Sequence, residues 1–399
     1  MKQKPCPICL SNDVSTFFRW EKTVTRQQFL MKTKEEAQQC KRGSIELAFC
    51  GNCGIIWNAA FDPRLLGYSA LYEATQMLSP AFHRYVEDIA KYLIRKHDLH
   101  GKDIVEIGCG DGGFLNLLCE LGDNRGTGFD PSWQTENGKD LPEKIRIIPD
   151  YYSARHATYE ADLICCRHVL EHIRQPVPFL KELARLNQKR NPTFFFEVPN
   201  VTWSLRTLAF WDIYYEHCLY FSRAALCYLF ELCDFDISEV QEGFGGQYVW
   251  IDGLFKPGKR GAGSMTDLSE EVSKLAHDVK TFSTCHRAIV EELQRKINSF
   301  TKKEKVVVWG AGAKAVAFLN FLNVDPGQIE FVVDINPKKW GAYVPGTGQE
   351  VVSADFLVQH KPDIILVMNP QYLSEVNEMI ERMGVPARLM AIGKGNREN

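Results

Sequence analysis

The run DIYYEHCLYFS at residues 212–222 gathers side chains that handle protons within a mostly apolar stretch. A β-strand would place Tyr214 and Glu216 on one face and His217 on the other, and a helix would separate neighbours by about a quarter turn. Only a turn, or the mouth of a cleft at a strand end, brings the three together. Histidine has a reference pKa of about 6.5 and can accept a proton at neutral pH. We therefore predict a proton-transfer site here, provided that other elements supply such a loop.

Two Cys-x-x-Cys pairs near the start of the chain have the form of zinc knuckles. Cys6 pairs with Cys9 and Cys50 with Cys53, and nearby Pro and Gly residues free the backbone to bend over an ion. Together they supply four soft thiolates, the number that a closed tetrahedral site needs. Such a site has no open coordination position, so we expect a structural Zn²⁺ without chemistry. Four unrelated thiols are the alternative, and a redox pair is disfavoured because no βαβ pattern surrounds either pair.

The bulk composition is typical of a soluble protein with two or three domains. A chain of 399 residues is too long for a single domain with one hydrophobic core. Of its residues, 45% are apolar and 24% are charged. A formal charge of −3 argues against a nucleic-acid partner, because such binders usually carry a basic stripe. No secretory signal is recognisable, and no apolar run approaches the roughly 20 residues that cross a bilayer. With 13 cysteines, we expect reduced thiols and a cytoplasmic location, without a membrane partner.

The segment KDIVEIGCGDGGFLNLL, residues 102–118, predicts a buried strand, a glycine turn and a helix. The G-x-G-x-x-G spacing is met by Gly108, Gly110 and Gly113. Asp130 ends the next predicted strand, where a carboxylate can bind ribose hydroxyls. This spacing also fits a dinucleotide site. However, Glu106, Cys109 and Asp111 make the turn acidic, which disfavours a pyrophosphate and suits a sulfonium cation with an ammonium group.

VEIGCGDGGF resembles the first motif of class I S-adenosylmethionine-dependent methyltransferases. Three later segments resemble the third, fourth and fifth strands of that fold: IIPDYYS at 147–153, ADLICCRHVLEHI at 161–173 and TFFFEVPN at 193–200. The resemblance implies that S-adenosylmethionine is bound by Glu106, the three glycines and Asp130, with Tyr151 beside the adenine. A Rossmann-type turn without a ligand is the alternative.

Over almost its whole length the chain resembles sugar C-methyltransferases of deoxysugar biosynthesis, which act on nucleotide-linked keto-sugars. CPIC, YSALYEATQMLSPAFHRYVEDIA and VVDINPKKWGAYVPGT carry this resemblance. The family usually has another histidine where Tyr215 stands. It also tends to have a glycine-serine-leucine-arginine run where this chain reads GGQYVWIDG, residues 245–253. If that run shapes the acceptor pocket, the sugar is unusual or the acceptor is not a sugar.

The reaction implied by this resemblance methylates a carbon beside a ketone. His217 would remove the proton from that carbon, while Tyr214 and His172 are candidate donors to the enolate oxygen. Glu216 would orient a ring or bind a sugar hydroxyl, and Tyr72 would line the cleft. The enolate carbon then attacks the sulfonium methyl, and proximity supplies much of the rate.

The last third of the chain predicts a helix followed by a second Rossmann-type unit. Apolar residues recur at steps of three and four over 266–300, which predicts an amphipathic helix with a break near Ser283. KVVVWGAGAKAVAFLNFLN then repeats the strand–glycine turn–helix pattern, with about four parallel strands in all and Asp334 at a strand end. In the resembling family this unit closes over the sugar nucleotide without a redox cofactor. Lys314 would then contact a diphosphate.

We therefore predict an α/β protein in three parts. Residues 1–70 form a zinc-binding domain and connector, 71–255 a class I methyltransferase domain, and 256–399 a linker helix and a C-terminal Rossmann-like domain. The expected activity is S-adenosylmethionine-dependent C-methylation of a nucleotide-activated keto-deoxysugar, with a small molecule as partner and a monomer as a plausible state. The alternatives are an O- or N-methyltransferase for another metabolite, an NAD-dependent oxidoreductase built on the last hundred residues, and a zinc-containing binding protein.

Overall fold

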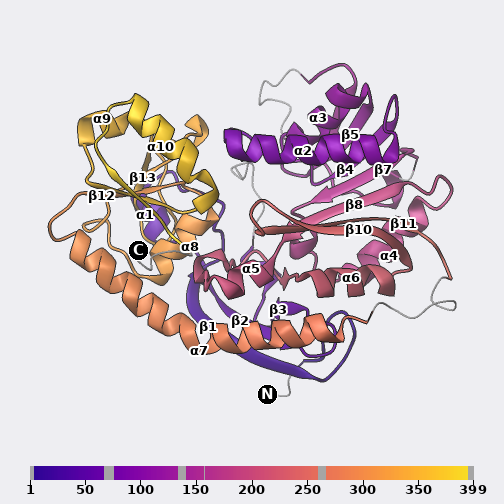
Figure 1. Cartoon of the computed structure of the whole chain (residues 1–399), viewed down its shortest axis with the longest axis horizontal. Helices are drawn as coiled ribbons and strands as arrows, with labels where there is room; N and C mark the ends of the chain where they lie inside the picture. Colours follow the sequence, from indigo (N-terminus) through magenta and orange to yellow (C-terminus); the bar gives the residue numbers. More distant parts are fainter. Residues whose placement is uncertain (1–3, 67–75, 134–140, 157, 259–266, 394–399) are drawn as a thin grey trace.

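The computed structural model describes residues 4–66, 76–133, 141–156, 158–258 and 267–393. Two α/β units lie side by side, with a small N-terminal sheet and one long helix beneath them (Figure 1). No helix in these ranges has the length and apolar character needed to cross a membrane.

The N-terminal sheet has four strands in the order β1-β2-β3-β9, and all its pairs are antiparallel. Its strands are β1 (Val14–Val24), β2 (Arg42–Cys50), β3 (Ile56–Asn58) and β9 (Leu219–Tyr220). A short helix, α1 (Lys34–Gln38), lies between β1 and β2. Ile56 pairs with Tyr220, so the last strand comes from the run that carries Tyr214 and His217. The N-terminal unit therefore holds one end of that run.

The central sheet has seven strands in the order β10-β11-β8-β7-β4-β5-β6. The parallel strands are β4 (Asp103–Ile107), β5 (Arg125–Phe129), β6 (Ile145–Ile148), β7 (Leu163–Arg167) and β8 (Thr193–Pro199). The strands predicted from the motif segments are thereby confirmed. The antiparallel pair β10 (Phe235–Gly243) and β11 (Tyr248–Phe255) completes the sheet and was not foreseen.

Helices cover both faces of this sheet (Figure 1). One face carries α2 (Pro80–His97) and α3 (Gly113–Gly122). The other face carries α4 (Pro176–Leu186), α5 (Val201–Arg206) and α6 (Arg223–Leu232). Because both faces are covered, the central strands are almost continuously apolar, as LICC in β7 and FFF in β8 illustrate.

The C-terminal sheet has five parallel strands in the order β14-β13-β12-β15-β16, one more than the sequence predicted. Its strands are β12 (Val306–Trp309), β13 (Phe331–Val333), β14 (Glu350–Val352), β15 (Ile364–Val367) and β16 (Arg388–Ala391). Its helices are α8 (Ala313–Phe321), α9 (Phe356–His360) and α10 (Leu373–Arg382). The prediction of about four strands was wrong because RLMA in β16 is short and only partly buried.

The long helix α7 (Ser269–Phe300) is continuous, so the predicted break near Ser283 was wrong. The Ser283 hydroxyl donates to the Phe17 carbonyl of β1 over 2.9 Å, which gives this polar side chain a partner outside the helix. The apolar side of α7, including Val272, Leu275 and Phe282, is buried. The helix runs below both α/β units (Figure 1).

Both parallel sheets are doubly wound, and this places their ligand-binding edges. In the central sheet the chain moves outward from β4 to β6 and returns to β7 on the other side of β4. In the C-terminal sheet it moves from β12 to β14 and returns to β15. Ligands bind at the carboxyl ends of strands at such reversal points. Residues that follow these strands, including His168 after β7 and Gly310 after β12, line a common cavity.

Candidate functional site

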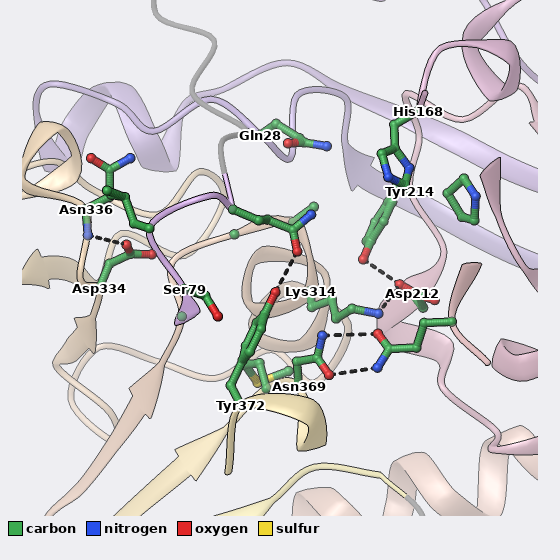
Figure 2. Close-up of a pocket in the computed structure, with 18 of the residues that line it drawn as sticks. Gln28, Ser79, His168, Asp212, Tyr214, Lys314, Asp334, Asn336, Asn369 and Tyr372 are labelled. Carbon is green, nitrogen blue, oxygen red and sulfur yellow. Dashed lines mark hydrogen bonds and ion pairs between the residues drawn. The ribbon is translucent and has the colours of Figure 1, made fainter. Parts of the chain in front are cut away.

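A cavity of about 260 Å³ lies between the carboxyl ends of the two parallel sheets. It is far larger than the roughly 30 Å³ that one water occupies, so it can admit part of a small molecule. Figure 2 shows side chains entering it from both units. The central unit contributes His168, Glu171, His172, Asp212, Tyr214, His217, Gln247 and Tyr248, and the C-terminal unit contributes Gly310, Gly312, Lys314, Asp334, Asn336 and Asn369.

The Tyr-Glu-His run forms a loop between β9 and the short 3₁₀ turn Phe210–Asp212, as its spacing required. The backbone N–H of Tyr214 donates to the Tyr220 hydroxyl at 3.1 Å. The Tyr220 hydroxyl in turn donates to the backbone carbonyl of Tyr214 at 2.6 Å. Glu216 is not among the residues that line the cavity. Its carboxylate accepts the backbone N–H groups of Gln27 at 3.0 Å and Gln28 at 3.3 Å. Glu216 therefore fastens the loop to the N-terminal unit.

Two of the predicted histidines meet in the cavity wall. The rings of His172 and His217 lie 4.9 Å apart, and the Tyr214 ring is also 4.9 Å from that of His217. Burial, followed by the charges of His172 and His168, lowers the pKa of His217 well below its usual value. Burial also lowers the pKa of His172 to about 4. Both imidazoles are therefore neutral at physiological pH.

Asp212 joins the central unit to α8. Its Oδ1 accepts the Tyr214 hydroxyl at 2.7 Å and pairs with Lys314 Nζ at 2.5 Å, and its Oδ2 accepts the Ser204 hydroxyl at 2.8 Å (Figure 2). Lys314 Nζ also lies 4.8 Å from the centre of the Trp203 ring. The pair is largely buried, with side-chain exposures of 8% for Asp212 and 18% for Lys314. Lys314 thus reaches the cavity, but its charge is already paired.

Sequence reasoning missed a buried charge network beneath the cavity. Glu197 has no exposed surface and accepts Arg167 Nε at 2.8 Å and the Tyr85 hydroxyl, and His168 Nε2 lies 3.2 Å from its Oε2. Burial raises the pKa of Glu197, but Arg167 and His168 more than offset this and bring it to about 2. Arg167 and Glu197 are direct neighbours across β7 and β8. The sequence did contain a signal for this ion pair, because one basic and one acidic residue occur near the ends of two apolar predicted strands.

The glycine turn after β4 has the conformation that its sequence implies. Gly108 and Gly110 have φ values of +72° and +54°, and a Cβ on Gly108 would lie 2.2 Å from Val169 Cγ2. Around a Cβ on Gly110 no atom lies within 4 Å, so this side of the turn is open to a ligand. The third left-handed residue is Gly112, at φ +78°, while the predicted Gly113 begins α3.

The acidic residues of this turn are placed differently from one another. Asp130 follows β5, and its carboxylate accepts the N–H of Gly110 at 2.8 Å and that of Ser132 at 2.8 Å. Glu106 is 3% exposed, and burial raises its pKa to about 8. Glu106 is therefore mostly protonated at neutral pH. The negative charge near the turn comes from Asp130 and Asp111 instead.

The two remaining expected positions are Tyr151 and Tyr72. Tyr151 follows β6 and is 60% exposed, so its ring has a free face. Tyr72 lies outside the described residues.

The four predicted zinc ligands come together. Their Sγ atoms all lie within 4.8 Å of one another, with Cys6 at 3.6 Å from Cys53 and Cys9 at 3.5 Å from Cys50. A tetrahedral zinc–thiolate site with bonds of about 2.3 Å separates its sulfurs by about 3.8 Å. The four thiols therefore fit a closed Zn²⁺ site, in which the ion would link the Cys6–Cys9 turn to the Cys50–Cys53 turn and take no part in catalysis.

The C-terminal side of the cavity is a second glycine turn. Gly310 has a φ of +101°, and a Cβ on Gly310 or on Gly312 would meet no atom within 4 Å. Asp334, which follows β13, accepts the Ala311 N–H at 2.8 Å and pairs with Lys339 at 3.1 Å. In a dinucleotide site this position would hold a ribose. Asp334 contacts its glycine turn in the same way as Asp130 contacts Gly110, and it differs from Asp130 in its ion pair with Lys339.

Comparisons with known proteins agree with this geometry. Residues 77–240 match a family described as a methyltransferase domain, and residues 266–385 match a C-methyltransferase C-terminal domain. The C-methyltransferase NovU of Streptomyces niveus is 27% identical over 349 residues, which cover 83% of this chain and 81% of NovU.

Solved structures of methyltransferases also align with part of the chain. A 1,6-didemethyltoxoflavin-N1-methyltransferase of Burkholderia thailandensis, with bound S-adenosylhomocysteine, aligns over 44% of this chain and 81% of its own at 13% identity and a TM-score of 0.34. An Aquifex aeolicus methyltransferase aligns over 42% and 89% at 14% identity and a TM-score of 0.33. From the matched domains and the doubly wound sheet with its glycine turn, the chain is an S-adenosylmethionine-dependent methyltransferase with a class I Rossmann-like fold.

Proposed function

We propose that this methyltransferase transfers the methyl group to a carbon beside the ketone of a nucleotide-linked keto-deoxysugar. The observation that carries the proposal is the composition of the cavity wall. The neutral imidazoles of His172 and His217 line one side, and the glycine turn after β12 with the start of α8 lines the other. Methylation at carbon needs a base for a weak carbon acid. The match to a C-methyltransferase C-terminal domain and the similarity to NovU support the same chemistry.

His217 is the proposed base. Its buried imidazole stays unprotonated at neutral pH, so it can accept the proton that the acceptor carbon loses. Tyr214 and His172 line the same wall, and Glu216 holds the loop through Gln27. S-adenosylmethionine supplies the transferable methyl when bound.

The donor would occupy the first glycine turn, next to the cavity. Gly108 contacts Val169, the neighbour of His168 in the cavity wall, and Met77 beside Gly113 adjoins the cavity-lining segment from Gln76 to Ser79. The proposed donor-binding residues are Glu106, Gly108, Gly110, Gly113, Asp130 and Tyr151.

The C-terminal unit offers groups that suit a diphosphate. The first N–H groups of α8, which starts after Gly312, have no partner within the helix, and such helix starts favour anions. Asn336 Nδ2 is buried in the cavity wall without a hydrogen-bond partner among the described residues. Two lysines line the cavity, Lys314 paired with Asp212 and Lys339 paired with Asp334. A nucleotide-linked acceptor would satisfy these donors.

The run GGQYVWIDG also takes part in the cavity. Gln247 and Tyr248 line it, and Gln247 exchanges two hydrogen bonds with Asn369 of the C-terminal unit, at 2.8 and 3.1 Å. The departure of this run from the resembling family therefore supports an altered sugar specificity. The same four cysteines, Cys6, Cys9, Cys50 and Cys53, are the proposed structural zinc site.

The test is methyl transfer from S-adenosyl-[methyl-¹³C]methionine to a set of 4-keto-6-deoxyhexoses linked to dTDP, UDP, CDP or GDP. We expect one of them to gain the labelled methyl on carbon, identified by ¹³C NMR of the product, while the corresponding sugar without a ketone gains none. Labelled methyl on oxygen or nitrogen would contradict the proposal, and so would a lack of transfer to every keto-sugar. Hydride transfer with NADH and no methyl transfer would favour the oxidoreductase alternative.

A further inference from the structure

An enolate needs a hydrogen-bond donor at its oxygen, and the two residues expected to supply it have their protons engaged elsewhere. The Tyr214 hydroxyl donates to Asp212 Oδ1 over 2.7 Å. His172 Nδ1 lies 2.9 Å from the Glu216 carbonyl oxygen, which can only accept, so the one proton of neutral His172 sits on Nδ1. Neither side chain has a proton left for the acceptor.

Glu171 lies beside both histidines in the cavity wall. It lies in the short 3₁₀ turn Leu170–His172 that follows β7, is 2% exposed and lines the cavity. Its Oε2 is buried and has no hydrogen-bond partner in the described part of the chain. One of its carboxyl oxygens and a ring nitrogen of both His172 and His217 lie within 4.8 Å of one another.

We propose that Glu171 is a further catalytic residue, which acts as a neutral carboxylic acid and donates a hydrogen bond to the acceptor's carbonyl oxygen as the enolate forms. This inference rests on the proposed C-methylation and adds the group that stabilises its intermediate. Donors fixed at the position of a developing oxyanion are among the largest contributions to catalysis.

The surroundings of Glu171 favour its protonated form. A buried carboxylate oxygen without a hydrogen bond is costly, so Oε2 favours the protonated form, and this outweighs the backbone N–H of Glu171 itself, which lowers the pKa. Burial, together with the negative charge of Glu197, raises the pKa of Glu171 to about 8. The buried guanidinium of Arg167 is paired with Glu197. His168 Nδ1 is 3.9 Å from Glu171 Oε1, beyond hydrogen-bond range, and the thiol of Cys218 donates to the Glu171 backbone carbonyl rather than to the side chain.

The proton and electron balance of the step is simple. The proton on the acceptor carbon moves to His217, and the carbon–hydrogen electron pair becomes part of a carbon–carbon double bond. The carbonyl π pair moves to the oxygen, which accepts the hydrogen bond from Glu171, and that proton stays on Glu171. The carbon–carbon π pair then forms the new bond to the methyl, the pair on oxygen returns to form the ketone, and the sulfur keeps the electrons of its broken bond. His217 then releases its proton to solvent.

Two variants separate donation from packing. Glu171→Gln keeps the shape and an N–H donor but cannot ionise, whereas Glu171→Leu removes the donor. Glu182→Gln, on the exposed side of α4, is the matched control. With the keto-sugar that the wild type methylates, we expect kcat of Glu171→Leu to fall about 10²- to 10³-fold. Glu171→Gln should lose much less. Donor affinity should be unchanged in all three.

The dependence on pH gives a signature that a purely structural residue would not produce. The protonated form is the active one, so wild-type kcat should fall as pH rises through about 8. This alkaline limb should be absent in Glu171→Gln and present in Glu182→Gln. A limb that persists in Glu171→Gln would overturn the proposal, and so would a Glu171→Leu enzyme within a few-fold of wild-type kcat.

Infrared difference spectroscopy of the full-length protein tests the protonation state without any substrate. We expect a protonated carboxyl band at pH 6.5 that is missing from Glu171→Gln, and an ionised Glu171 would refute the inference whether or not the enzyme methylates sugars. Failure of every keto-sugar with the wild type, despite that band, would instead overturn the proposed function. Metal analysis addresses a divalent cation held by Glu171, His172 and His217: a second metal ion per chain that is lost in Glu171→Gln would also overturn donation by Glu171.

Discussion

Replacing Glu197 by Gln tests the charge network below the cavity. The Glu197 carboxylate has no exposed surface and meets Arg167 at 2.8 Å through Nε and 2.7 Å through Nη2. Gln keeps the shape but leaves the guanidinium buried without an anion. The shift of the Glu197 pKa from 4.5 to about 2 corresponds to about 3 kcal/mol of stability. Breaking a buried ion pair costs roughly 3–5 kcal/mol, which agrees with that value.

The direction of the pKa shift sets the pH dependence of this loss. Because the folded pKa is lowered, the stabilisation is fully present above the unfolded pKa of 4.5 and disappears only as pH falls towards 2. The difference between wild type and Glu197→Gln should therefore be about 3 kcal/mol at about pH 8 and should shrink at about pH 3. Urea unfolding followed by tryptophan fluorescence measures it, with Glu182→Gln as the exposed control.

Two results would refute this reasoning about Glu197. One is a decrease in the free energy of unfolding of less than about 1 kcal/mol, which is the contribution of an exposed ion pair. The other is a difference that is as large at about pH 3 as at about pH 8. The double variant Arg167→Met with Glu197→Leu provides a further check, because replacing a whole buried pair by apolar groups is often close to neutral. It should recover most of the stability lost in Glu197→Gln.

Three further predictions concern the base, the donor site and the cysteine cluster. His217→Ala should lower turnover about 10²- to 10⁴-fold and leave donor affinity, measured by calorimetry, within about twofold, since a lost general base acts on chemistry alone; a large loss of donor binding would argue against this role. Asp130→Ala should weaken donor binding about 10- to 100-fold through loss of charge-assisted hydrogen bonds, and unchanged affinity would mean that the ribose lies elsewhere. Cys6→Ser should contain less than one zinc per chain and unfold at lower temperature, whereas full metal content would show that the ligands are misassigned.

The parts of the site that could be predicted from the sequence depend on local pattern. The glycine turn, the strand that follows it and the two cysteine pairs each lie within short segments whose spacing is set by backbone geometry. The loop around His217 was also foreseeable, because neither strand nor helix lets Tyr, Glu and His converge. What could not be read from that run is that Glu216 binds the backbone of Gln27, which lies 189 residues away in the sequence.

The remaining features depend on contacts between distant segments. Arg167 and Glu197 are partners only because β7 and β8 are adjacent in this register. Asp212 meets Lys314 only when the two α/β units face each other. Ser283 appeared to interrupt α7 because the carbonyl of Phe17, which receives its hydroxyl, belongs to another unit. Glu171 lies in HVLEHI beside the predicted His172, yet only the structure shows that its Oε2 is buried without a hydrogen-bond partner among the residues described.

The central claim is that this cavity turns a keto-sugar into a carbon nucleophile, and hydrogen exchange tests it most directly. The wild-type enzyme is incubated in D₂O with the keto-sugar that it methylates and with S-adenosylhomocysteine in place of the donor. We predict that proton NMR shows loss of the hydrogen on the carbon beside the ketone, and that His217→Ala does not catalyse this loss. Retention of that hydrogen by the wild type, while labelled methyl is still transferred from the donor, would contradict the account.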